Sequence, residues 1–361
     1  MNAQFPRDYW AARERFRQAA AALGCAREAH PLQARGPRGE ELTIDVAVTA
    51  GADSRRTLII SSGIHGVEGF LGSAIQCALL EEWATAPPPV RCVLLHALNP
   101  FGFAWRRRVN EQNVDVNRNL LLDGEAFAGS AKLYSELDSL LNPKHAPSRW
   151  RPLAPGLIAA LARHGMPALK QALASGQYDY PQGLFYGGAG PAPTNSILSA
   201  HLQRWVGAAT QVLHIDFHTG LGRWGTFKLL TDQRLSKAQS ARLGQWFGAG
   251  AIQAVGAEGV AAYSARGTLG RWAAAHNPGR DYLFIAPEFG TYSVVQVLAG
   301  LRAENQAHHW CDPADAAVET AKQRLVELFC PQSGPWRHQT LQAGLRIVAQ
   351  AIAGLAARPS I

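Results

Sequence analysis

The feature that most constrains the fold of this chain is an alternation between short apolar runs and segments with helical periodicity. Residues 56–61 and 90–95 are apolar runs of a length typical of strands buried on both faces of a sheet. A helical pattern over residues 72–83 separates the two runs, and prolines at 87–89 end it. Such an alternation predicts an α/β fold.

The same two patterns recur along the rest of the chain. Further strands are predicted at residues 42–48, 212–217, 226–230 and 282–287. Further helices are predicted at residues 8–23, 132–141, 156–175, 316–329 and 340–356. The sequence shows no internal repeat and no linker-like segment, so we expect residues 1–361 to form a single domain.

Composition argues against several classes of protein. A hydrophobic content of 47% allows a large core. The formal net charge is +8, but the basic residues are scattered and mostly arginine, so we expect no nucleic-acid partner. The five cysteines are widely spaced and include no C-x-x-C pair, which favours reduced thiols. The N-terminus lacks a signal pattern and no apolar run reaches about 18 residues, so we expect a cytoplasmic protein without a membrane partner.

His65 and Glu68 form an H-x-x-E element in a glycine-flanked turn directly after the strand predicted at 56–61. An imidazole and a carboxylate are both ligands for a divalent metal, and together they leave room for a water. The pattern alone is weak, because a structural histidine beside a helix-capping glutamate gives the same four residues. A third ligand from elsewhere in the chain would decide between the two interpretations.

The strand predicted at 212–217 supplies that third ligand. Its alternation places His214, Asp216 and His218 on one face, with His218 at the strand end, where ligands meet open sheets. His218 is therefore the predicted ligand, Asp216 is a candidate for orienting it, and His214 is expected to be a buried structural residue. Two imidazoles and one carboxylate match hydrolytic zinc sites, so we predict one Zn²⁺ per chain.

Two further segments carry polar residues that are candidates for catalysis or substrate binding. Glu288 ends the apolar strand predicted at 282–287, where burial of a carboxylate is costly, and it is a candidate general base. The alternative is an exposed or salt-bridged glutamate. Asn117 and Arg118 follow three consecutive arginines at 106–108, which by themselves are typical of a solvated surface. An amide beside a guanidinium fork can bind a substrate carboxylate.

Taken in order, these motifs resemble those of the zinc carboxypeptidase family, the carboxypeptidase A-like metallopeptidases. The similarity is greatest to a bacterial branch close to the aspartoacylase and succinylglutamate desuccinylase-type deacylases. It spans about residues 57 to 292 and rests on His65-x-x-Glu68, Asn99-Pro100-x-Gly102, Val114-Asp115-x-Asn117-Arg118-Asn119, His218 and Glu288.

The resemblance implies a mixed, twisted sheet of about eight strands with helices on both faces and zinc at the carboxyl ends of the strands. It also implies roles for individual residues: zinc ligands His65, Glu68 and His218, general base Glu288, oxyanion-stabilising Arg108, and carboxylate-binding Asn117 and Arg118.

Two looser matches concern substrate binding. Tyr263 keeps the spacing to Trp272 that the family's mobile tyrosine loop shows, which implies a contact with substrate. The alternative is an aromatic side chain packed in a surface loop. Arg271 stands where the family commonly has an acidic residue in its specificity pocket, and we hypothesise that an acidic substrate side chain is accommodated there.

The activity implied by the resemblance is zinc-dependent amide hydrolysis, with carboxypeptidase-like cleavage of short peptides that bear a free carboxylate. The segment from Asn119 to His218 is much longer than the corresponding stretch of digestive carboxypeptidases, and we expect a helical insertion at about residues 120–200 to narrow the cleft. Two alternatives stay open. One is deacylation of N-acyl amino acids, as in aspartoacylase, and the other is a catalytically inactive carboxylate-binding protein on the same fold.

Overall fold

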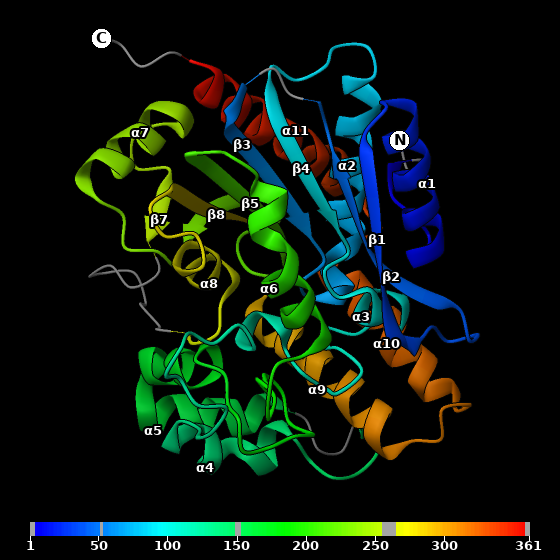
Figure 1. Ribbon diagram of the computed structural model, residues 1–361. Coiled ribbons are helices and arrows are strands. Elements are labelled where there is room, and N and C mark those ends of the chain that lie inside the picture. Colours follow the sequence, from blue (N-terminus) through cyan, green and yellow to red (C-terminus); the bar gives the residue numbers. More distant parts are fainter. Residues whose placement is uncertain (1–3, 51–52, 149–152, 255–264, 358–361) are drawn as a thin grey trace.

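The computed structural model describes residues 4–50, 53–148, 153–254 and 265–357 (Figure 1). Its centre is an eight-stranded mixed sheet with the order β1-β2-β4-β3-β5-β8-β6-β7. The strands are β1 (Ala26–Arg35), β2 (Glu41–Val48), β3 (Asp53–Ser62), β4 (Val90–His96), β5 (Gln211–Thr219), β6 (Phe227–Thr231), β7 (Ile252–Ala254) and β8 (Asp281–Phe289). The predicted α/β class with about eight strands is confirmed.

The four central strands β4, β3, β5 and β8 run parallel to one another. β2 and β6 pair antiparallel to β4 and β8, and β1 extends the sheet beside β2. Because the central strands are parallel, their carboxyl ends lie along one edge, where the predicted site residues were placed.

Helices cover both faces of the sheet, as expected (Figure 1). The described α-helices are α1 (Tyr9–Ala22), α2 (Gly69–Trp83), α3 (Pro100–Ala104), α4 (Lys132–Leu141), α5 (Leu153–Ala174), α6 (Pro193–Val206), α7 (Lys237–Phe247), α8 (Leu269–Ala275), α9 (Val294–Trp310), α10 (Ala316–Phe329) and α11 (Gly334–Ala356). Two short 3₁₀ helices that matter for the site are η2 (Gly66–Glu68) and η3 (Val116–Arg118).

The core explains the apolar run in the middle of β3. Leu58 and Ile60 pack in a cluster with α1, α2 and α11, whereas Ile59 packs in a second cluster with α6 and α8. All three side chains are fully buried, so both faces of the strand need apolar residues at these positions.

The helical insertion contains α4 and α5, which lie together below the carboxyl ends of the strands in Figure 1. Their apolar side chains pack with α9 and α10 in a third cluster. The predicted helix at 156–175 begins earlier, at Leu153, and is interrupted at Gly165, whose φ of 79° breaks the helical path before Pro167.

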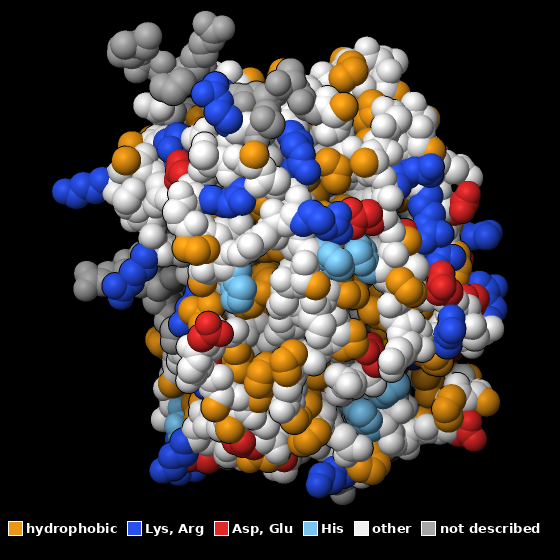
Figure 2. Space-filling model, in the orientation of Figure 1, with side chains coloured by type: hydrophobic (Ala, Val, Ile, Leu, Met, Phe, Trp, Pro, Cys, Tyr) orange, Lys and Arg blue, Asp and Glu red, His pale blue; other side chains and the backbone are white. Residues whose placement is uncertain are grey.

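Charged residues are dispersed on the face shown in Figure 2, where Lys and Arg side chains alternate with acidic and apolar ones. All five cysteines are free thiols, as expected, and four of them are buried. None of the helices in the described part of the chain is long and apolar enough to cross a membrane.

Candidate active site

The loop that carries His65 and Glu68 is held against the segment after β4. β3 ends at Ser62, and Gly63 turns the chain with a φ of 68°. Gly66 then lies so close to Gly102 that a Cβ would stand 2.1 Å from its backbone. The N–H groups of Gly66 and Val67 donate to the carbonyls of residues 108 and 107. The H-x-x-E turn is therefore fixed by the Asn99–Arg108 segment before any ligand binds.

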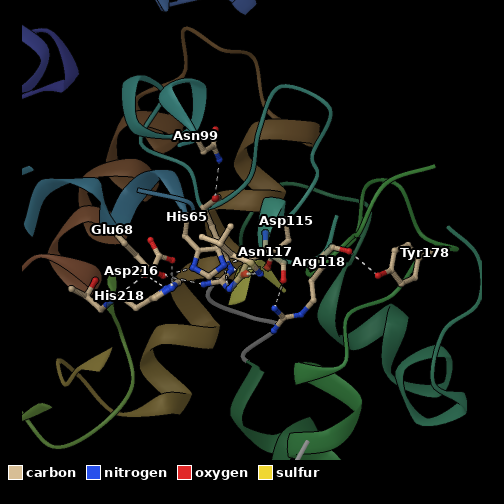
Figure 3. A network of polar contacts seen from close by, with 12 residues as sticks. His65, Glu68, Asn99, Asp115, Asn117, Arg118, Tyr178, Asp216 and His218 are labelled. Carbon is tan, nitrogen blue, oxygen red and sulfur yellow. Dashed lines mark hydrogen bonds and ion pairs between the residues drawn. The ribbon is translucent and has the colours of Figure 1, made fainter. Parts of the chain in front are cut away.

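His65, Glu68 and His218 converge at the carboxyl ends of β3 and β5 (Figure 3). One ligand atom from each lies within 4.8 Å of the other two, and all three side chains are buried. Nδ1 of His65 lies 2.9 Å from one Glu68 oxygen, and Nδ1 of His218 lies 3.1 Å from the other. Both imidazoles thus present the same nitrogen to one carboxylate.

The three side chains fit a divalent metal. Nδ1 of His65 is buried and has no hydrogen-bond partner among the described residues, since its short contact to Glu68 lacks hydrogen-bond geometry. Buried polar atoms are rarely left unpaired, and an imidazole lone pair directed at a carboxylate is a natural position for a cation. Two histidines and one glutamate form a donor set that suits zinc.

Two carboxylates orient the imidazoles from behind. Nε2 of His65 lies 3.1 Å from Asp115 Oδ1, and Nε2 of His218 lies 2.7 Å from Asp216 Oδ2. The hydrogen bond of Asp115 and the ion-pair contact of Asp216 both favour a proton on Nε2, which leaves Nδ1 directed at the centre. Arg108 Nη2 also lies 2.7 Å from His65 Nε2, but two N–H groups cannot bond each other, so we assign the tautomer from Asp115.

Asp115 contacts His65 in the candidate site, although the sequence predicts no role for it. It lies in the quoted D-x-N-R-N motif, but its contact with His65 joins residues 50 positions apart. Burial raises the pKa of its carboxyl, and the neighbouring Arg108, His65 and Arg118 outweigh this and hold the pKa well below its usual range. Asp216 was foreseen as an orienting residue, and it also accepts a hydrogen bond from Ser61 Oγ at 2.6 Å.

Glu288 lies beside this centre on β8, in register with His218 on β5. Its Oε1 accepts a hydrogen bond from the backbone N–H of Leu221 at 2.9 Å. Burial and the charge of Glu68 raise the pKa of Glu288 to about 7, because both disfavour its ionised form. A cation bound by Glu68 would offset that charge and lower the pKa.

Arg108 borders the same centre, with its side chain 15% exposed. Its Nε donates to Asp115 Oδ2 at 3.1 Å, and its Nη1 donates to Glu68 Oε1 at 3.2 Å. The run of three arginines therefore is not a uniform solvated surface. Arg106 pairs with Glu319 at the surface, whereas Arg107 is fully buried.

Asn117 and Arg118 lie in η3, which begins after Asp115 and is capped by it through the N–H of Asn117. Figure 3 shows both side chains beside the His65 network. Asn117 Oδ1 accepts a hydrogen bond from the N–H of Leu269 at 2.9 Å, so only its amide nitrogen is left to donate to a ligand. The carbonyl of Arg118 accepts from Tyr178 Oη at 2.7 Å, which fixes the backbone of η3 against the insertion.

Three other residues singled out in the sequence have different outcomes. Tyr263 lies outside the described residues. Arg271 forms an ion pair with Glu125 at 2.8 Å, so an acidic substrate group would have to compete with that carboxylate. His214 is fully buried between Ser61 and Tyr282, both at 2.8 Å, and burial lowers its pKa to about 4. Its predicted structural role agrees with these contacts.

Solved structures with a similar fold define the class of this chain. Carboxypeptidase A from Helicoverpa armigera is 11% identical and aligns over 89% of this chain and 73% of that chain with a TM-score of 0.50. Thrombin activatable fibrinolysis inhibitor is 12% identical, with 90% and 75% coverage and a TM-score of 0.49. Murein-tripeptide amidase MpaA from Escherichia coli O157 is 18% identical, with 83% and 97% coverage and a TM-score of 0.38.

At 11% identity the similarity to carboxypeptidase A concerns the fold alone, and it makes this an α/β protein of the carboxypeptidase-like fold class. No curated protein sequence matches the chain significantly. The chain belongs to the family described as "Protein of unknown function (DUF2817)", whose match covers residues 5–343.

Proposed function

We propose that this protein is a zinc-dependent amide hydrolase with carboxypeptidase-like activity on short peptides that bear a free carboxylate. The observation that carries the proposal is the convergence of His65, Glu68 and His218 beside Glu288 at the carboxyl ends of three parallel strands. A metal site with three protein ligands and an adjacent carboxylate is the arrangement that metal-assisted hydrolysis requires.

In this proposal His65 Nδ1, His218 Nδ1 and the Glu68 carboxylate hold one Zn²⁺ per chain. When bound, the ion would polarise the scissile carbonyl and acidify a water. Asp115 and Asp216 would keep both imidazoles in the tautomer that the ion needs.

Glu288 acts as the general base. Its Oε1 is engaged by the N–H of Leu221, which leaves Oε2 to take a proton from the attacking water and deliver it to the leaving amine. Arg108 is held through Nε by Asp115 and through Nη1 by Glu68, which keeps its guanidinium at the edge of the metal site, where it would stabilise the oxyanion that develops on the substrate.

Arg118 and the amide nitrogen of Asn117 bind the substrate carboxylate. The same groups would serve deacylation of N-acyl amino acids, because those substrates also place an amide next to a carboxylate. We treat residues 1–361 as one catalytic unit in which the insertion at about 120–200 borders the cleft. Five free thiols suit a reducing compartment, so we place the activity in the cytoplasm.

The test is to follow amine release from three matched substrate sets: short peptides, the same peptides with an amidated C-terminus, and N-acyl amino acids. We expect turnover of the free peptides, loss of turnover on amidation, and no turnover by Glu288→Gln. Preference for N-acyl amino acids would select the deacylase alternative. Binding of these ligands without turnover of any of them would show a carboxylate-binding protein and contradict the proposal.

A further inference from the structure

Unusual backbone conformations gather around the candidate site. Among the described residues, the non-glycine residues with positive φ are Ala97, Arg106, Asn113 and Phe185. The first three lie in the chain between β4 and Asp115, and Phe185 lies in the insertion. Asparagine tolerates this region, but a bulky residue such as phenylalanine adopts it only when the surrounding structure imposes it.

Phe185, with a φ of 60°, is held by contacts on both sides. The N–H of Gln177 donates to the Phe185 carbonyl at 3.1 Å. On one side, the carbonyl of Leu184 accepts from Tyr134 Oη at 2.6 Å. On the other side, the carbonyl of Tyr186 accepts from the N–H of Asp115 at 2.7 Å. The strained residue is thus fixed both to α4 and to the carboxylate residue that orients His65.

This conformation brings the ring of Phe185 to Arg108. The guanidinium carbon of Arg108 lies 5.8 Å from the ring centroid, within the range of a cation–π contact. A small cavity beside the two residues is lined by both of them. The edge of the Arg108 guanidinium contacts Asp115, Glu68 and His65. The Phe185 ring adds a contact on the face of the guanidinium that restrains the tilt of its plane.

We propose that Phe185 is a positioning residue that holds the Arg108 guanidinium in the orientation in which its Nη groups face the reacting carbonyl. The inference rests on the hydrolytic function proposed above, because it assigns Phe185 an effect on the oxyanion that Arg108 stabilises. The insertion then contributes to the rate of reaction through Phe185, in addition to bordering the cleft.

Three variants of Phe185 distinguish the effect of its aromatic ring from the effect of its strained backbone conformation. Phe185→Leu keeps apolar bulk and the strained φ but removes the aromatic face. Phe185→Gly removes the ring and relieves the strain, so it guards against a loss that reflects misfolding. Phe185→Tyr keeps the face. We expect kcat to fall about tenfold in the leucine and glycine variants with KM unchanged, and the tyrosine variant to restore kcat.

A double-mutant cycle with Arg108→Lys tests whether the effect passes through Arg108. In that background Phe185→Leu should cost little or nothing further, because the residue it positions is gone. An equal loss in both backgrounds, or an unchanged kcat in the leucine and glycine variants, would overturn the proposal.

An NMR measurement that does not depend on enzyme activity tests the positioning role of Phe185 separately from the proposed hydrolytic function. The Nε–Hε resonance of Arg108, assigned by its absence in Arg108→Lys, should shift or broaden in Phe185→Leu and stay in place in Phe185→Tyr. An unmoved resonance in Phe185→Leu would overturn the positioning role even if the protein is a hydrolase. A moved resonance in a protein without turnover would leave the contact standing and reject the hydrolytic function.

Discussion

Two adjacent arginines enter two buried charged clusters of different composition. Arg107 is 1% exposed and donates to both oxygens of Glu304 on α9, at 2.9 and 3.2 Å. Lys322 on α10 donates to the same carboxylate at 2.9 Å. Glu304 therefore joins two cations from separate segments. Each charged group of this cluster contacts a group of opposite charge, although Nη1 of Arg107 has no hydrogen-bond partner among the described residues.

The cluster around Arg108 is composed differently. Glu68, Asp115 and Asp216 are buried there with two imidazoles, and Glu288 adjoins them. Carboxylates outnumber the guanidinium groups, and Nδ1 of His65 has no hydrogen-bond partner in the described part of the chain. Burial of uncompensated charge is costly, so this donor set is suited to a divalent cation, whereas the Arg107 cluster is suited to holding helices together.

The comparison teaches that burial of charge does not by itself indicate function. What distinguishes the Arg108 cluster is its excess of carboxylates over guanidinium groups and the approach of two imidazole nitrogens to one carboxylate. Substitutions in the Arg108 cluster should therefore change the catalytic rate with little change in the free energy of unfolding. Substitutions in the Arg107 cluster should lower the free energy of unfolding with little change in the catalytic rate.

The largest effect is expected for Glu288→Gln. The amide cannot accept the proton of the water, so kcat should fall by about 10³-fold or more while the metal content stays the same. Amine release and metal analysis on the same preparation measure both quantities. Activity retained within tenfold of wild type would remove Glu288 from the role of general base.

In the Arg107 cluster, the corresponding substitution of a glutamate is Glu304→Gln. It leaves Arg107 and Lys322 without their buried counter-charge, so the free energy of unfolding should drop by about 3 kcal/mol. Denaturant titration measures the loss, and kcat of the folded protein should be unchanged. The control is Glu319→Gln, which breaks the exposed pair with Arg106 and should cost less than about 1 kcal/mol. Equal losses for the two variants would contradict the distinction between buried and exposed pairs.

Arg118→Ala should produce a smaller effect that depends on the substrate. Loss of the guanidinium should raise KM for free-carboxylate substrates by about 30-fold, since one charged hydrogen-bonding group is removed. The same substitution should hardly change KM for the C-terminal amides. A similar rise for both substrates would show that Arg118 supports the fold of η3 and does not bind the carboxylate.

The smallest effect concerns pH. Glu288 must be ionised to accept a proton, so kcat/KM should rise with pH through its pKa and then level off. That pKa is about 7 from burial and the charge of Glu68, and a bound cation should bring the midpoint below this value. A rate that stays constant between about pH 4 and 8 would contradict the assignment of the base.

Most of the sheet could be predicted from sequence because its central strands are buried on both faces and contain apolar runs. The strand predicted at 56–61 lies within β3, and that at 90–95 within β4. Helix α9 was not predicted, although it has 17 residues. Its buried face carries Glu304 and the polar residues around it, so it lacks the apolar periodicity that reveals a helix. Edge strand β1 was missed because most of its side chains are exposed or half-buried.

The candidate site likewise contains residues that could be predicted from the sequence and contacts that could not. The positions of His65, His218 and Glu288 followed from strand ends, since parallel strands place their carboxyl ends along one edge. The contact of Asp115 with His65 and the approach of Phe185 to Arg108 depend on tertiary packing between distant segments. No local pattern encodes such contacts.

The measurement that tests the account most directly is the zinc content of the purified protein and of two variants from the same strand. We predict about one zinc per chain in the wild type and in His214→Ala, whose imidazole is directed to Ser61 and Tyr282, and a loss of zinc in His218→Ala. Circular dichroism of each variant confirms that it is folded. A wild-type protein that takes up no zinc at micromolar supply, or a His218→Ala protein that keeps it, would contradict the metal centre on which the proposed function depends.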